Sequence, residues 1–171
     1  MELLKANREN LSMLNEMVNH FTEEEYTRQL AIISNATIGQ HIRHILEFYE
    51  CLIIGAKCGT VSYDKRERKL QLEEDTEFTQ NTISRILLEL NNIDFDRPLF
   101  LKASFSTEND SDLGVLSSSA TRELAYCLEH TVHHLAILKI AVRETFNHIY
   151  MDENLGVAYS TIKYKKRECV Q

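Results

Sequence analysis

The sequence predicts an all-α fold, an up-down four-helix bundle with a small β-hairpin inserted between its third and fourth long helices. The 171 residues include 5 glycines and 1 proline, which favours long helices over the many tight turns of an all-β fold. Four long segments also carry apolar residues at helical spacing. A chain of this length suits one core, so we expect residues 1–171 to form a single helical-bundle domain.

The first two long helices are expected in the N-terminal third of the chain. Apolar side chains recur every three or four positions over residues 2–20, which predicts the first helix. The second begins after Thr37, because Gln40 stands three residues on, where a capping box requires it. It should end within residues 55–59, and a charged connector with the composition of a solvated loop follows over residues 61–68.

The third long helix and the hairpin come next. Asp75 or Thr76 can cap a helix that runs to about Asn92. Residues 99–106 then alternate partly between apolar and polar side chains. Residues 114–118 can return as their partner strand across a turn at 108–112.

The fourth long helix should begin after Ser118 or Ser119 and run to about His148. Residues 155–162 lack a clear period, so we expect an extended tail packed on the bundle. The basic run over residues 163–167 is interpreted as a solvated terminus.

Charge and apolar content argue against two classes of partner. The formal net charge of −7 disfavours nucleic acid, because binding a phosphate backbone needs a net basic face. No apolar run approaches the length that spans a bilayer, and the N-terminal residues lack the apolar core of a signal peptide. We therefore expect a cytoplasmic protein with no nucleic-acid and no membrane partner. Its 4 cysteines show no paired spacing, which is typical of free thiols in a reducing compartment.

A candidate metal site lies in the fourth long helix. His130 and His134 are four residues apart, so both imidazoles project from one helix face and can close on a single ion. His133 is rotated by about 100° from His134 and is the least suited to share that site. A third ligand must come from another helix, where His41 and His44 lie on nearly one face. Three neutral imidazoles and an open position form the catalytic pattern for zinc, and imidazole also suits nickel, iron and copper.

Two segments in chain order give the sequence a specific resemblance. Residues 37–47 read TIGQHIRHILE and residues 129–134 read EHTVHH, in a helical frame of this length. Together they resemble the DinB superfamily (DNA-damage-inducible, YfiT-like), over essentially the whole chain. The resemblance implies a four-helix bundle with a divalent metal held by one histidine of the second helix and two of the fourth. Carried over by position, the implied ligands are His44, His130 and His134.

The resemblance also implies a function. It suggests a metal-dependent enzyme, such as a thiol-dependent S-transferase or a hydrolase, that acts on a small-molecule substrate with a low-molecular-weight thiol. Zinc and nickel are the favoured ions, with iron, manganese and cobalt as alternatives, and relatives of this type are often homodimers. Many members continue with Arg-Gly-Gln after the histidine run, whereas this chain has Leu-Ala-Ile over residues 135–137. No residue of the chain identifies the thiol, the substrate or a catalytic group beyond the metal ligands.

Two other interpretations remain open at this stage. In one, the protein is a non-catalytic, stress-linked metal-binding protein or helical dimer with a structural ion. Cys127 on the histidine face would then complete a closed site, although a plain core cysteine is the commoner case. In the other, the protein is a metal-free helical dimer. Glu47 and Glu129 are candidates for orienting the ligands, and His41 for lining the pocket or replacing His44.

Overall fold

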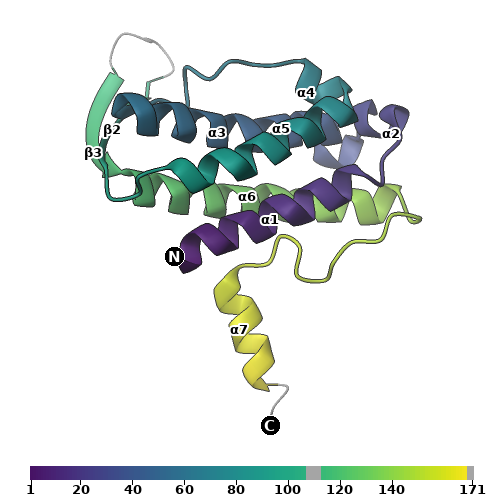
Figure 1. The fold of residues 1–171 in the computed structure, drawn as a ribbon. Helices are drawn as coiled ribbons and strands as arrows, with labels where there is room; N and C mark the ends of the chain where they lie inside the picture. The colour runs from purple at the N-terminus through teal and green to yellow at the C-terminus, as the bar shows by residue number, and fades with distance from the viewer. Residues whose placement is uncertain (107–112, 169–171) are drawn as a thin grey trace.

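The structure is a computed structural model, which describes residues 1–106 and 113–168 (Figure 1). These residues form seven α-helices, two 3₁₀ helices and three β-strands. In chain order the elements are α1 (Glu2–Val18), α2 (Glu23–Thr27), η1 (Ala31–Ile33), α3 (Ile38–Cys58), β1 (Thr60–Val61), α4 (Gln71–Glu74), α5 (Thr76–Glu89), η2 (Leu90–Asn92), β2 (Pro98–Ser104), β3 (Leu113–Ser119), α6 (Ala120–Thr145) and α7 (Tyr159–Glu168).

The predicted all-α, up-down four-helix bundle is wrong. The described ranges contain a mixed sheet of three strands. They also contain three α-helices, α2, α4 and α7, in addition to the four long ones. The strand order is β1-β2-β3, with β1 parallel to β2 and β2 antiparallel to β3. The predicted hairpin is present as β2 and β3, although its expected turn at 108–112 lies outside the described residues.

The additional strand β1 follows from how α3 ends. Gly59 adopts a left-handed conformation with φ of 85° and donates its backbone N–H to the Gly55 carbonyl at 2.7 Å. The chain then extends, and Val61 pairs with Leu101 of β2. A Cβ on Gly55 would lie 2.2 Å from the Val61 side chain, so glycine there lets the strand pack onto its own helix. A two-residue strand whose partner lies forty positions on leaves no periodic signal in the sequence.

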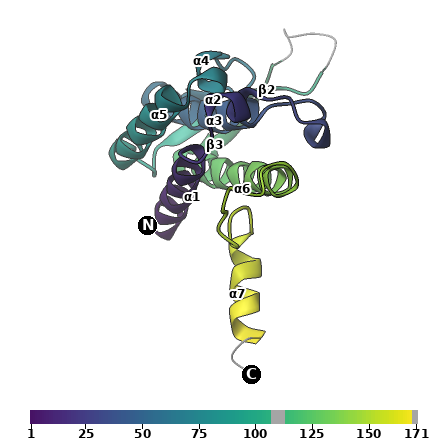
Figure 2. The same ribbon diagram turned by 90° about the vertical axis from the view of Figure 1, so that its right-hand side faces the viewer.

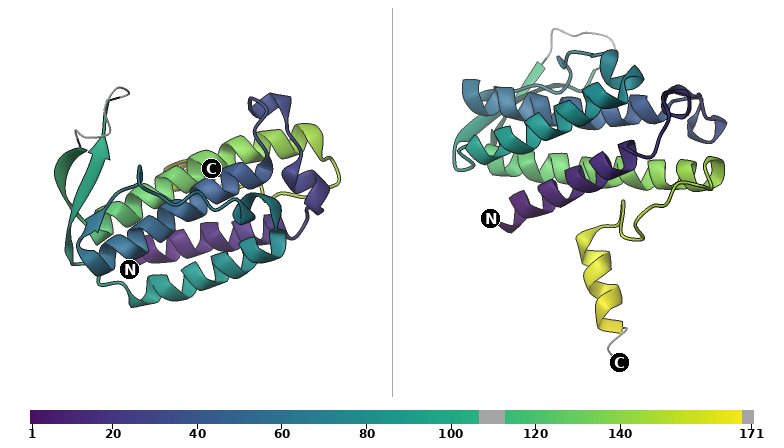
Figure 3. Two further views of the ribbon diagram at one scale, coloured as in Figure 1. Left: turned by 90° about the horizontal axis from the view of Figure 1, so that it is seen from above. Right: turned by 45° about the vertical axis from the view of Figure 1, so that its right-hand side comes forward.

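The four long helices α1, α3, α5 and α6 run alongside one another (Figures 1 and 3). Helix α3 contacts α5 and α6, and α1 contacts the same two helices, so their apolar stripes meet in one core. Thr37 and Gln40 form the predicted capping box that begins α3, and Ser119 caps α6. None of the helices in the described ranges is both long enough and apolar enough to cross a bilayer.

The C-terminal segment differs from the predicted extended tail. Residues 159–168 form α7, which projects away from the long helices in two perpendicular views (Figures 1 and 2). None of its residues is buried, and its basic residues supply no apolar stripe that a periodicity argument could detect. The Tyr159 hydroxyl ties its first turn to α1 by contacts to Glu9 at 3.0 Å and to Asn10 at 3.2 Å.

Candidate metal centre

The contact between α3 and α6 brings the three predicted metal ligands together. One ring nitrogen from each of His44, His130 and His134 lies within 4.8 Å of the other two. The ring centroids are 4.5 Å apart for the two α6 histidines and 4.8 Å apart for each pair that includes His44. All three side chains are half-buried. We call this group the trihistidine cluster.

His130 is held by an aromatic stack. The Phe48 ring lies against the His130 ring at 4.1 Å and an interplanar angle of 9°, and Tyr63 stacks on Phe48 at 4.6 Å. Nε2 of His130 is buried and has no hydrogen-bond partner among the described residues. A buried polar atom without a partner is costly, so this nitrogen is suited to accept a hydrogen bond or to ligate an ion through its lone pair.

The cluster is neutral near pH 7. The pKa is lowered to about 4 at His44 and His130 and to about 3 at His134, and burial is the largest cause. Neighbouring imidazoles contribute to these lowered pKa values, and the Arg66 guanidinium contributes at His44 and His130. Metal ligands must be deprotonated, so the three rings are in the form that binds an ion.

His41 lies beside the cluster. Its Nδ1 is 2.9 Å from Nδ1 of His134, a hydrogen bond that joins α3 to α6. His133 is exposed, and its ring meets that of His134 edge-on at 5.4 Å. The structure therefore brings His44 into the cluster, holds His41 next to it and leaves His133 at the surface.

The charged connector after β1 packs on α3 instead of forming a solvated loop. Nε of Arg66 lies 3.3 Å from the carboxylate of Glu47, and its guanidinium sits 5.9 Å from the centre of the Phe48 ring. Arg43 approaches the same carboxylate at 3.5 Å, and the backbone N–H of Lys69 donates to it at 2.9 Å. Glu47 is 1% exposed, and burial raises its pKa despite these partners. It therefore anchors the connector and makes no bond to a cluster histidine.

The connector also allows a weaker interpretation of the sequence, in which Asp64, Arg66 and Arg68 form an ion-pair cluster that orders the loop over a site. The structure contains only part of such a cluster. Arg66 lies by the Phe48 ring that stacks on His130. Asp64 instead accepts a hydrogen bond from the Ser104 backbone N–H at 2.8 Å, and Arg68 is exposed. No pattern in the sequence places Arg66 beside the histidines, because its partner Glu47 belongs to a different element. Sequence spacing alone carries no sign of this contact.

The candidate fourth ligand Cys127 and the candidate orienting residue Glu129 both lie outside the cluster. Cys127 is fully buried, and its sulfur contacts the Tyr63 hydroxyl at 3.9 Å and the Phe48 carbonyl at 3.8 Å. Burial raises the pKa of this thiol, which disfavours the thiolate that a metal would need. Glu129 is exposed and faces solvent.

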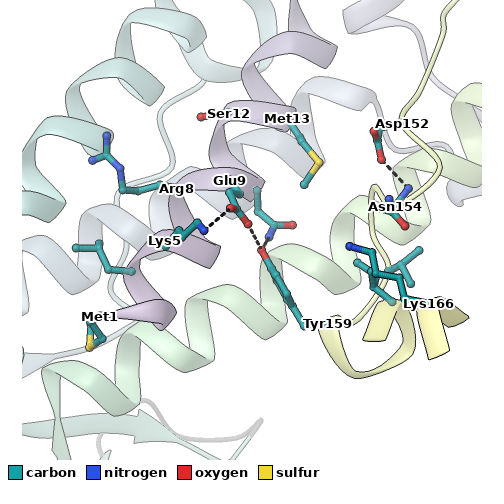
Figure 4. A pocket seen from close by; sticks show the side chains of 14 residues that line it. Met1, Lys5, Arg8, Glu9, Ser12, Met13, Asp152, Asn154, Tyr159 and Lys166 are labelled. Atoms are coloured by element: carbon teal, nitrogen blue, oxygen red, sulfur yellow. Dashed lines mark hydrogen bonds and ion pairs between the residues drawn. The ribbon is translucent and has the colours of Figure 1, made fainter. Parts of the chain in front are cut away.

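A large cavity lies on another side of the molecule. It has a volume of about 850 Å³ and lies between α1 and α7 (Figure 4). Arg8, Asp152, Tyr159 and Lys166 are among its lining residues, and no member of the trihistidine cluster is. This cavity is therefore separate from the trihistidine cluster.

The donor set fits a divalent ion of intermediate softness. It consists of three neutral imidazoles without a carboxylate, which suits zinc, nickel or iron. Nitrogens bound to one tetrahedral zinc at ~2.1 Å lie ~3.4 Å apart. Side-chain rotations that shift the nitrogens by about 1 Å would therefore close the cluster on an ion.

Comparison with known proteins gives limited information. No protein-family model matches this chain. FK506-binding protein 5 of Rhizopus delemar is 32% identical to it over 111 residues, which cover 63% of this chain. The chain spans 28% of the length of that relative, so the likeness assigns neither a family nor an activity.

Proposed function

We propose that the chain is a metal-dependent enzyme of the DinB type, with His44, His130 and His134 as ligands of one divalent ion. The observation that supports this most directly is the buried Nε2 of His130, which lacks a hydrogen-bond partner in the described part of the chain and belongs to a group of three neutral imidazoles. Zinc and nickel are the favoured ions, and iron, manganese and cobalt are the alternatives. The resemblance of residues 37–47 and 129–134 to the superfamily motifs is the second line of support.

The proposed chemistry is thiol transfer to, or hydrolysis of, a small electrophilic substrate. A divalent ion at such a site supplies a Lewis acid that lowers the pKa of a bound thiol or water. The stack of Phe48 and Tyr63 orients His130, and the Arg66 guanidinium adds positive potential that favours an anionic group of the substrate. The low-molecular-weight thiol, the homodimer and the cytoplasmic location belong to the same proposal.

A closed, structural ion is the weaker alternative. It needs a fourth protein ligand, and Cys127 is a poor candidate because its thiol is buried against Tyr63 and Phe48. Among the described residues, the group that can hold an ion consists of three histidines. Three protein ligands are the pattern of catalytic zinc sites.

Metal analysis tests this proposal. Untagged protein, purified without chelator, should bind about one equivalent of one metal when zinc, nickel, iron, manganese and cobalt are added back. His44→Ala, His130→Ala and His134→Ala should each lose the ion, whereas His20→Ala, at an exposed position, should retain it. If no ion binds, the proposal is wrong. If the ion does bind, S-transfer assays with bacillithiol, mycothiol or glutathione follow with that ion.

A further inference from the structure

We propose that His41 is a positioning residue, whose Nδ1 accepts a hydrogen bond from Nδ1–H of His134 and so directs Nε2 of His134 toward the ion. This inference rests on the proposed metal site but concerns a residue outside its ligand set. His44 is then a metal ligand and His41 its neighbour's hydrogen-bond partner, although the two residues lie about one turn from each other on α3.

The direction of the hydrogen bond follows from counting protons. The two Nδ1 atoms lie 2.9 Å apart, so one ring donates and the other accepts. A ligating imidazole is neutral and carries one N–H. If His41 were the donor, Nδ1 of His134 would be the acceptor and its Nε2 would carry the proton, which leaves no lone pair for an ion. Metal binding with this contact intact therefore requires His134 to donate from Nδ1.

His133 and Glu47 are not placed to accept this hydrogen bond from His134. His133 is exposed, and its ring lies edge-on to His134 at 5.4 Å. Glu47, a buried carboxylate on α3, is engaged by Arg43, Arg66 and the Lys69 backbone. His41 is the partner that the structure records for a His134 ring nitrogen. Acceptors of this kind fix the tautomer and the ring orientation of metal-bound histidines.

The first test measures zinc affinity by competition with a chromophoric chelator. His41→Ala should weaken binding by about 10–100-fold, the usual effect of losing such a partner. His41→Asn should recover most of the affinity, because its amide oxygen can occupy the position of Nδ1. His133→Ala is the matched control and should bind zinc as the wild type does. Equal loss in the Ala and Asn variants would indicate that His41 is itself a ligand, and unchanged affinity in His41→Ala would show that it has no role; either result overturns the inference.

The second test needs no metal. Long-range ¹H–¹⁵N NMR of the metal-free protein should show the Nδ1–H tautomer of His134 in the wild type and a shift toward Nε2–H in His41→Ala. A wild-type His134 in the Nε2–H tautomer would overturn the inference. Because this measurement is independent of metal binding, it separates a failure of the inference from a failure of the proposed metal site.

Discussion

Replacement of Phe48 by leucine tests whether the aromatic stack, and not only the two helices, presents His130 to an ion. Phe48 is 6% exposed and stacks on both His130 and Tyr63. Each aromatic pair contributes about 0.5–1.5 kcal/mol beyond its buried area, so the loss of these two stacked pairs alone should lower the free energy of unfolding by about 1–3 kcal/mol. Leucine keeps most of the apolar volume, which limits any further loss from a cavity to about 1.5 kcal/mol or less.

The same substitution should weaken zinc binding about tenfold, because the His130 ring loses the surface that fixes its orientation. Phe146→Leu is a matched control. Phe146 is 3% exposed and packs edge-on against Phe21 at 5.7 Å, away from the cluster. Urea denaturation of the metal-free proteins gives the stability change, and chelator competition gives the affinity. If both variants lose stability and both keep the wild-type zinc affinity, the positioning role of Phe48 is refuted.

Three further predictions concern charge, acid and the C-terminal helix. Glu47→Gln should lower the free energy of unfolding by about 2 kcal/mol, because Arg66 and the Lys69 backbone N–H lose a buried carboxylate. Arg43 keeps its ion pair with Glu73, and Glu67→Gln, at an exposed position, should have little effect in the same urea titration. The metal-free protein should lose stability as the pH falls from about 6.5 toward 4, because the pKa values of the cluster histidines are lowered in the folded state. The unfolded chain therefore binds more protons at these three histidines in this pH range. A variant with all three replaced by glutamine should show a flatter profile of melting temperature against pH. Tyr159→Phe should speed tryptic cleavage within α7 without an equal loss of global stability, because the Tyr159 hydroxyl ties α7 to α1. Tyr164→Phe is the control, because the hydrogen bond of the Tyr164 hydroxyl lies within α7.

Local patterns in the sequence predicted the elements that carry the site. The spacing of Thr37 and Gln40 predicted the capping box of α3, and Asp75, one of the two residues predicted to cap α5, is its N-cap. The four-residue spacing of His130 and His134 placed both rings on the face of α6 that meets His44. These features depend on residues within a turn or two of each other, where helix geometry alone fixes which side chains share a face.

Features that depend on contacts between distant segments were not predictable. The strand β1 exists because Val61 pairs with Leu101, and Arg66 reaches the site because Glu47 lies on the facing side of α3. The orientation of His41 toward His134 depends on the axial register of α3 against α6, which the sequence of either helix leaves undetermined. Packing between elements decides each of these contacts, and packing has no period along the chain.

The histidines of α3 and those of α6 lie far apart in the sequence, and this distance affects when the site can form during synthesis. The hydrogen bond between His41 and His134 joins residues 93 positions apart, so its formation requires closure of a long stretch of chain. During synthesis from the N-terminus, α3 is complete long before α6 emerges from the ribosome. The newly made His41 and His44 therefore face solvent or other partners until most of the chain has been translated. An ion that needs all three cluster histidines can be acquired only after that point, as one of the last events in maturation.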